Sequence, residues 1–144
     1  MADEIRIPVK SDVDVVAARQ KGRELAGSLG FSSGDQVLIA TSISELARNI
    51  VSYAKTGEII LQTAEHRGSP GIVVIARDRG PGIEDPDLAL KEGYSTSRSM
   101  GMGLPGVKRL MDEFDLATET GRGTTVTVKK WKNPNHASNG WKLS

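Results

Sequence analysis

The stretch Ile72-Val-Val-Ile-Ala-Arg-Asp78-Arg-Gly-Pro-Gly82 constrains the fold most, because an apolar run leads directly into an acidic, glycine-rich turn. Residues 72–76 are continuously apolar, which is typical of a strand covered on both faces. Asp78 follows that strand and can accept a strong hydrogen bond from a ligand amino group. Gly80 and Gly82 would let a flat ring approach the backbone. An ordinary turn is the alternative for this motif taken alone.

Upstream of this run, the pattern predicts a strand, two helices and a further strand. Residues 4–10 alternate in polarity around Pro8, which indicates an edge strand. Apolar residues at three- and four-residue steps predict a helix over residues 12–30 and a second helix over about residues 32–53. Residues 57–64 alternate again, and a turn joins them to the apolar run.

Downstream, the pattern predicts a short helix over residues 85–92 and a polar loop over residues 93–103. A third helix over residues 104–114 and a β-hairpin over residues 116–131 follow. This order of elements predicts an α+β fold, a two-layer α/β sandwich with a mixed, mostly antiparallel sheet and helices on one face. We expect residues 1–132 to form one such domain. The last segment, 133–144, is polar and lacks periodicity, which predicts a disordered C-terminal tail.

Composition and charge exclude several classes of function. The 144 residues contain no cysteine, which excludes disulfide scaffolds, thiolate zinc sites and cysteine nucleophiles. Residues 1–119 carry 14 basic and 18 acidic side chains, and few residues are aromatic, which argues against nucleic acid as the main partner. No apolar run is long enough to span a membrane, and the N-terminus lacks a signal-peptide pattern. We therefore expect a cytoplasmic protein with no membrane partner.

Two further motifs carry residues suited to phosphate chemistry. Glu45 and Asn49 are four residues apart and share one helix face. A carboxylate can act on a hydroxyl proton and an amide oxygen suits Mg²⁺, although a solvated helix face is the alternative for this pair alone. Gly101-Met-Gly-Leu-Pro-Gly106 precedes a helix, and glycine-rich backbone at a helix N-terminus can bind phosphate. The Walker pattern and the dinucleotide-binding βαβ unit are both absent from the sequence.

Taken in order, four motifs resemble the N, G1, G2 and G3 boxes of the GHKL ATPases, the relatives of gyrase, Hsp90, histidine kinases and MutL that share the Bergerat fold. The matching stretches are Glu45-Leu-Ala-Arg-Asn49, Asp78-Arg-Gly-Pro-Gly82, Gly101-Met-Gly-Leu-Pro-Gly106 and Gly121-Arg-Gly-Thr124. Any one of these motifs is weak evidence, whereas four of them in order are specific. The resemblance implies a GHKL sandwich that binds ATP and Mg²⁺.

The resemblance also implies a role for each matching position. Asp78 would bind the adenine amino group with help from Thr124 through a water, and Asn49 would hold Mg²⁺. Glu45 would be the catalytic residue, acting on the acceptor hydroxyl. The other positions implied in the ATP site belong to the turn, the lid and the helix start: Gly80, Gly82, Gly93, Ser95, Thr96, Ser97, Gly101, Met102, Gly103, Leu104 and Gly106.

Three longer phrases, residues 43–50, 93–97 and 103–114, are similar to the serine/threonine switch kinases of the bacterial stressosome. This similarity implies an ATP- and Mg²⁺-dependent protein kinase that phosphorylates STAS-domain antagonist and scaffold proteins. On release from its antagonist, such a kinase activates a PP2C-type phosphatase. The alternative is an anti-sigma factor of the same fold that binds a sigma factor and phosphorylates its STAS antagonist. A third hypothesis is a non-catalytic binding module, against which the intact box residues argue.

Overall fold

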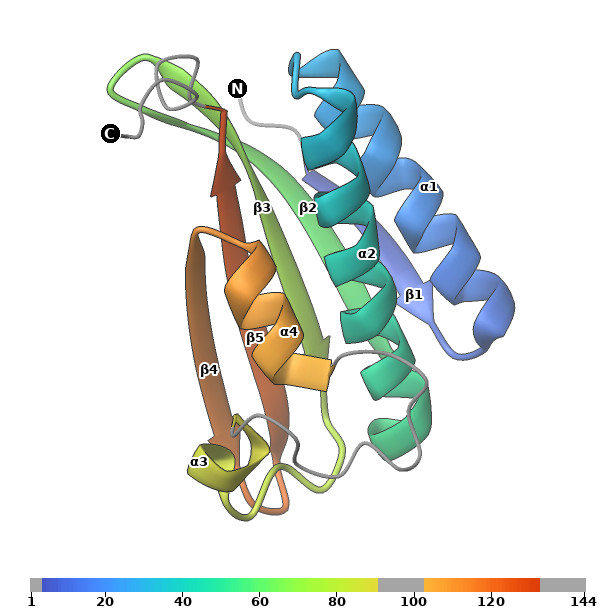
Figure 1. Ribbon diagram of the computed structural model, residues 1–144. Helices are drawn as coiled ribbons and strands as arrows, with labels where there is room; N and C mark the ends of the chain where they lie inside the picture. The colour runs from blue at the N-terminus through green and yellow to red at the C-terminus, as the bar shows by residue number, and fades with distance from the viewer. Residues whose placement is uncertain (1–3, 91–102, 133–144) are drawn as a thin grey trace.

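The computed structural model describes residues 4–90 and 103–132, which form two layers. One layer is a five-stranded sheet in the order β1-β2-β3-β5-β4, and all pairings between these strands are antiparallel. The other layer consists of helices that cover one face of the sheet (Figure 1). The predicted two-layer α/β sandwich is confirmed, and its sheet is antiparallel rather than mixed within the residues described.

The elements follow the predicted order along the chain. The strands are β1 (Glu4–Val9), β2 (Gly57–His66), β3 (Ser69–Asp78), β4 (Glu113–Glu119) and β5 (Gly123–Trp131). The helices are α1 (Asp12–Ser28), α2 (Ser33–Asn49), the π-helix η1 (Ile50–Ala54), the short α3 (Pro86–Ala89) and α4 (Gly103–Leu110). No helix in the described part of the chain is long and apolar enough to cross a membrane.

The core lies between the sheet and helices α1, α2 and α4. The helix-facing side chains of the central strands, such as Ile59 and Val74, are completely buried. Each contributes roughly 1.5–3 kcal/mol through burial of apolar surface. The buried Ile43 of α2 packs onto Gly22 of α1, where an added Cβ would lie 2.1 Å from the Ile43 Cδ1 atom. The missing side chain at Gly22 therefore lets the two long helices approach closely.

The boundary between α4 and β4 differs from the prediction. The third helix was expected to reach Phe114, but α4 ends at Leu110 and Phe114 lies in β4. Burial alternates along β4, and the strand pairs with β5 over its whole length. Strand pairing has therefore replaced the helical hydrogen bonds expected there. The loop predicted over residues 93–103 lies outside the described residues except for Gly103, as does the predicted tail over residues 133–144.

The second predicted helix also changes its form. After Asn49 it continues as the π-helix η1, in which Lys55 N donates to Ile50 O at 2.8 Å. Strands β2 and β3 are longer than predicted, because only the two residues Arg67 and Gly68 connect them. Both residues have positive φ. That conformation is typical of the tight turns that join twisted antiparallel strands.

At one end of the sheet, the polar side chains of one row of residues point toward the helices. Strand register places Asp78 of β3 beside Gly57 of β2 and Thr124 of β5, and Thr124 beside Thr118 of β4. Paired residues of neighbouring strands point to the same face of a sheet. This row is in phase with the buried Ala76, two residues earlier in β3. Asp78 therefore stands at the point where the apolar core ends.

Candidate functional site

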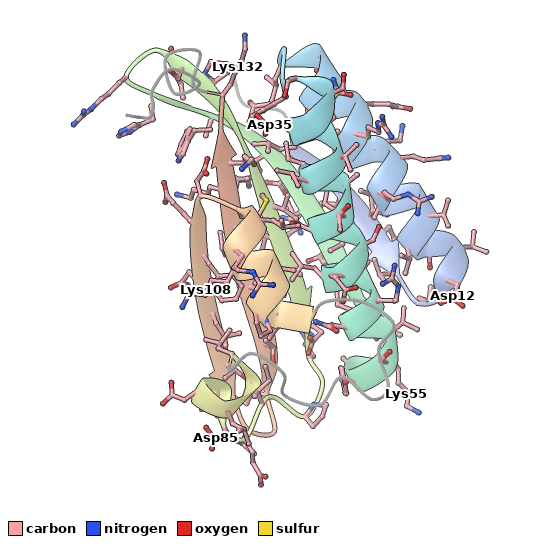
Figure 2. All side chains as sticks on the ribbon, viewed as in Figure 1. Asp12, Asp35, Lys55, Asp85, Lys108 and Lys132 are labelled. Atoms are coloured by element: carbon pink, nitrogen blue, oxygen red, sulfur yellow. The ribbon has the colours of Figure 1, made fainter. Side chains whose placement is uncertain are left out.

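A cavity of about 610 Å³ opens where the core ends. Segments that are distant in sequence line it, and most of its side chains are apolar. Asp85, before α3, and Lys55, after η1, mark this end of the molecule (Figure 2). The volume is within the range of about 300–1,000 Å³ that small-molecule sites occupy. The lining residues are Leu46, Asn49, Ile50, Tyr53, Ala54, Ala76, Asp78, Pro81, Gly82, Ile83, Glu84, Asp85, Leu88, Ala89, Gly103, Leu104, Pro105, Thr120, Thr124 and Val126.

The carboxylate of Asp78 is oriented by its own turn. Its Oδ1 atom accepts a hydrogen bond from Gly80 N at 2.8 Å. Among the described residues, no other group donates to this carboxylate, so Oδ2 is available to a ligand. A half-buried carboxylate oxygen of this kind can accept a charge-assisted hydrogen bond from an amino group.

Two threonine hydroxyls extend the polar row beside Asp78. Thr118 Oγ1 accepts from Ile83 N at 2.9 Å and donates to Gly123 O at 3.2 Å. It lies 2.9 Å from Thr124 Oγ1, and either hydroxyl can donate in that pair. In both cases the Thr124 hydroxyl can still bond to a water or a ligand, and the hairpin is tied to the segment after β3.

Gly82 allows the turn after β3 to pack against the β4–β5 connection. Its φ is 80°, and an added Cβ would lie 2.5 Å from the carbonyl oxygen of Glu119. Next to this contact, Gly121 N donates to Pro81 O at 2.7 Å. The close backbone approach explains the glycine at position 82, and it fixes the end of the turn that carries Asp78.

Replacement of Gly123 by alanine is expected to lower the free energy of unfolding by about 1–3 kcal/mol, the usual range for strained backbone. The φ of Gly123 is 127°, and an added Cβ would lie 2.2 Å from the carbonyl oxygen of Asp78. Gly121→Ala is the matched control, because its φ is 83° but no atom lies within 4 Å of an added Cβ. Urea unfolding should show the larger loss for Gly123→Ala. Equal losses would contradict the close approach to Asp78.

Glu45 is a buried carboxylate of α2 that lies against the start of α4. Its side chain is only 4% exposed. The Oε1 atom accepts from Arg48 Nη1 at 2.8 Å, and Oε2 accepts from Gly103 N at 3.4 Å. The ion pair with Arg48 supplies the partner that a buried charge requires. One carboxylate oxygen is thus held by a cation, while the other faces the first amide of α4 through a longer bond.

Asn49 is the last residue of α2, and it lines the cavity directly before the π-helix. π-Helical turns are rare and occur often at functional sites. Here the turn brings Tyr53 and Ala54 to the cavity. Gly80 packs against it, since an added Cβ would lie 2.6 Å from the Ala54 Cβ atom. The π-helix therefore contributes to the cavity wall and supports the turn that carries Asp78.

The structure brings most of the described predicted site residues to one place. Glu45 and Gly80 adjoin the cavity through their hydrogen bonds to Gly103 and Asp78. Gly106 is buried in α4 and is not a lining residue, so its phosphate role stays a prediction. The predicted residues that line the cavity are Asn49, Asp78, Gly82, Gly103, Leu104 and Thr124. Those outside the described residues are Gly93, Ser95, Thr96, Ser97, Gly101 and Met102.

Sequence reasoning missed two residues that shape the site. Thr118 bonds to Ile83, which is 35 residues away, and no local pattern signals such a contact. The sequence leaves Arg48 as a possible phosphate or partner contact or as solvated surface, and it does not predict the ion pair with Glu45 that the structure shows. Its spacing of three residues from a carboxylate on the same helix was the signal that could have identified this pair.

The described residues contain no group of three or more histidine, cysteine, aspartate or glutamate side chains that could hold a metal ion. Asn49 is the ligand that the sequence predicts for Mg²⁺. Mg²⁺ commonly keeps several waters and binds one or two protein groups together with substrate phosphates. One amide oxygen on the cavity wall is compatible with that chemistry, and magnesium at Asn49 stays a prediction.

Known proteins resemble this chain over much of its length. It is 49% identical to the serine/threonine-protein kinase RsbT of Bacillus subtilis over 131 residues, which cover 91% of this chain and 98% of that protein. It is 31% identical to the anti-sigma F factor of Caldanaerobacter subterraneus over 99 residues, covering 65% of this chain and 68% of that protein. The corresponding protein of Clostridium kluyveri is 28% identical over 97 residues, with 64% and 68% covered.

Fold comparison and a family model agree with these similarities. A crystal structure of the RsbU and RsbW domains of a Mycobacterium tuberculosis protein shares the fold, with a TM-score of 0.61, 21% identity, and coverage of 93% of this chain and 33% of that chain. Residues 34–134 match the model described as histidine kinase-, DNA gyrase B-, and HSP90-like ATPase. That match contains all of α2 except its first residue, the turn after β3, α4 and the β4–β5 hairpin. The chain therefore belongs to the family of histidine kinase-, DNA gyrase B- and HSP90-like ATPases.

Proposed function

We propose that this chain is an ATP- and Mg²⁺-dependent serine/threonine protein kinase that phosphorylates STAS-domain antagonist and scaffold proteins of a partner-switching pathway. The observation that carries the proposal is the 49% identity to the kinase RsbT, which extends over 98% of that protein. The cavity supports it independently, because Asn49 and Asp78 meet there and Glu45 lies beside it.

The described residues fit a purine nucleotide. The apolar lining suits a purine ring, and the free oxygen of Asp78 suits an exocyclic amino group. Gly103 begins α4 and its amide bonds to Glu45, while the first turn of the helix itself has no acidic side chain. The amides and the dipole at a helix N-terminus favour phosphate. Asn49 would hold Mg²⁺, which neutralises charge on the phosphates.

In this proposal Glu45 acts on the acceptor hydroxyl of the protein substrate. In the transfer, the serine or threonine oxygen bonds to the terminal phosphorus of ATP, the bond from that phosphorus to ADP breaks, and the hydroxyl proton passes to the Glu45 carboxylate. Arg48 and Gly103 hold this carboxylate in position. Phosphoryl transfer depends mainly on positioning and charge stabilisation, so a small set of groups is sufficient.

The proposal extends to the pathway. A STAS-domain partner would bind the kinase until it is phosphorylated, and the released kinase would activate a PP2C-type phosphatase. This exchange would take place in the cytoplasm, where ATP is available. Similarity to anti-sigma F factors, at 28–31% identity, keeps the binding of a sigma factor as the second candidate function.

Incubation with labelled ATP, Mg²⁺ and candidate STAS-domain proteins tests the proposed function. We expect label on a serine or threonine of the STAS protein, and no label when Mg²⁺ is chelated. Recovery of a sigma factor in a pull-down would instead support the anti-sigma function, and absence of label on every candidate would contradict the kinase proposal.

A further inference from the structure

A second cavity, of about 560 Å³, lies at the same end of the sheet. Strand register places Pro8, Glu58 and Arg77 in one row across β1, β2 and β3. This row alternates with the one that carries Asp78, so its side chains point away from the helices. We call the cavity the basic groove, which is lined by Arg6, Pro8, Lys10, Thr56, Gly57, Glu58, Arg77, Asp78 and Arg79.

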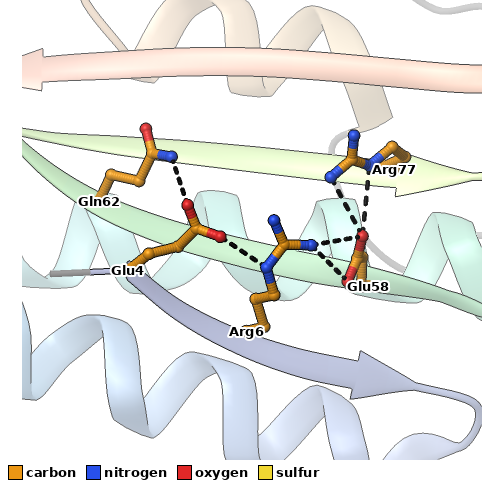
Figure 3. Close-up of polar contacts among 5 residues, drawn as sticks. All are labelled: Glu4, Arg6, Glu58, Gln62 and Arg77. Atoms are coloured by element: carbon orange, nitrogen blue, oxygen red, sulfur yellow. Dashed lines mark hydrogen bonds and ion pairs between the residues drawn. The ribbon is translucent and has the colours of Figure 1, made fainter.

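Two arginines of the basic groove are already paired (Figure 3). Glu58 Oε2 accepts from Arg6 Nη1 at 3.3 Å and from Arg77 Nε at 3.3 Å. Arg6 also pairs with Glu4, which accepts from Gln62 as well. The hydrogen bonds from Gln62 and Arg6 lower the pKa of Glu4, and the bond to Glu4 raises the pKa of Arg6. Glu4 and Arg6 therefore stabilise each other in their ionised forms.

Two other cations of the groove have no such partner. Lys10 and Arg79 are exposed, and neither side chain has a hydrogen bond or ion pair with any residue in the described ranges. The carboxylate of Asp78 belongs to the row that faces the helices, so Glu58 is the acidic side chain that faces this groove. The lining thus has four basic side chains and one acidic side chain that faces the groove, while Glu4 and Asp14 adjoin it through the ion pair with Arg6 and the hydrogen bond from Lys10 N. Residues 1–119 as a whole carry 14 basic and 18 acidic side chains, so the lining of the groove is more basic than this part of the sequence.

We propose that the basic groove is a docking site for an acidic, extended segment of a protein partner. Carboxylates of such a segment would pair with Lys10 and Arg79, the cations that lack partners. Nucleic acid fits less well, because the described lining has no aromatic side chain on which a base could stack. Asp78 lines both cavities, so docking here would place the partner beside the candidate nucleotide site. Docking itself does not depend on kinase activity, although a role in presenting a substrate rests on the proposed function.

Fluorescence anisotropy with a labelled peptide in which glutamate alternates with serine tests the proposal on the full chain without nucleotide. We expect Lys10→Glu/Arg79→Glu to weaken peptide binding at least tenfold. The matched control is Lys21→Glu/Arg23→Glu, which changes the same number of charges at exposed positions of α1 and should leave the affinity unchanged. Circular dichroism establishes that both variants are folded.

Three outcomes would overturn the inference. These are equal losses in the two double variants, no loss in the groove variant, and tighter binding of a single-stranded oligonucleotide than of the peptide at the same salt concentration. The anisotropy measurement requires neither ATP nor phosphoryl transfer. A negative result for peptide binding is therefore distinguishable from a negative result for the proposed kinase function. A labelled STAS protein with no peptide binding would leave the kinase proposal intact and remove only the groove.

Discussion

Glu45→Gln is expected to remove phosphoryl transfer to a STAS-domain acceptor while nucleotide binding is retained. Loss of a general base lowers rates by about 10²–10⁴-fold. Glutamine has the same shape and keeps an acceptor oxygen, but it cannot take a proton from the substrate hydroxyl. Single-turnover transfer from labelled ATP, measured at saturating nucleotide, reports the chemical step. Calorimetric titration with ATP reports binding separately.

Glu84→Gln is the matched control for this experiment. Glu84 also lines the cavity, but it is exposed and has no described ion pair. Its replacement should leave the transfer rate unchanged. Full transfer activity in Glu45→Gln would contradict the general-base assignment, and the buried pair of Glu45 with Arg48 would then be structural only. Thermal unfolding of both variants separates a lost proton acceptor from a lost fold.

The sequence was sufficient to predict the fold because its local patterns agree with its tertiary arrangement. The periods of α1 and α2 follow their buried faces, and the continuous apolar run of β3 matches a strand in the centre of the sheet. Prediction failed where tertiary contacts decide between two local options. Phe114 continues a helical pattern in the sequence, but in the structure it pairs with Val128 of β5 and belongs to β4. For the π-helix after Asn49, the sequence contains no local pattern that predicts this type of helix.

The candidate site also combines residues that the sequence could predict with contacts that it could not. Its motif residues Asn49, Asp78 and Thr124 could be predicted because each lies in a local motif, and the structure places them around one cavity. Some contacts that orient the site could not be predicted, because they join residues that are remote in sequence. The bond from Gly103 to Glu45 spans 58 residues. No sequence pattern reports a contact of that kind, so the orientation of the carboxylate emerges only from the packing of α4 on α2.

Asp78→Asn is expected to weaken ATP binding by about 1.5–3 kcal/mol, the range for a hydrogen bond to a charged group. That loss corresponds to about a ten- to hundredfold rise in Kd. Asparagine can still accept from Gly80 through Oδ1, so the turn should keep its shape. It replaces the free Oδ2 acceptor with an amide donor, which would oppose the amino group of adenine. Calorimetric titration with ATP measures the effect, and unchanged affinity would remove Asp78 from the adenine pocket.

Inosine triphosphate sharpens this test, because it carries a carbonyl oxygen where adenine has an amino group. The amide donor of Asp78→Asn can pair with that oxygen, so the variant should lose less affinity for inosine triphosphate than for ATP. Asp85→Asn is the control. Asp85 lines the same cavity and caps α3 through its bond from Leu88 N, and asparagine caps helices equally well. Its nucleotide preference should be unchanged. Equal losses for both nucleotides in Asp78→Asn would indicate that the carboxylate acts only through its charge, because a direct bond to the base must distinguish an amino group from a carbonyl oxygen.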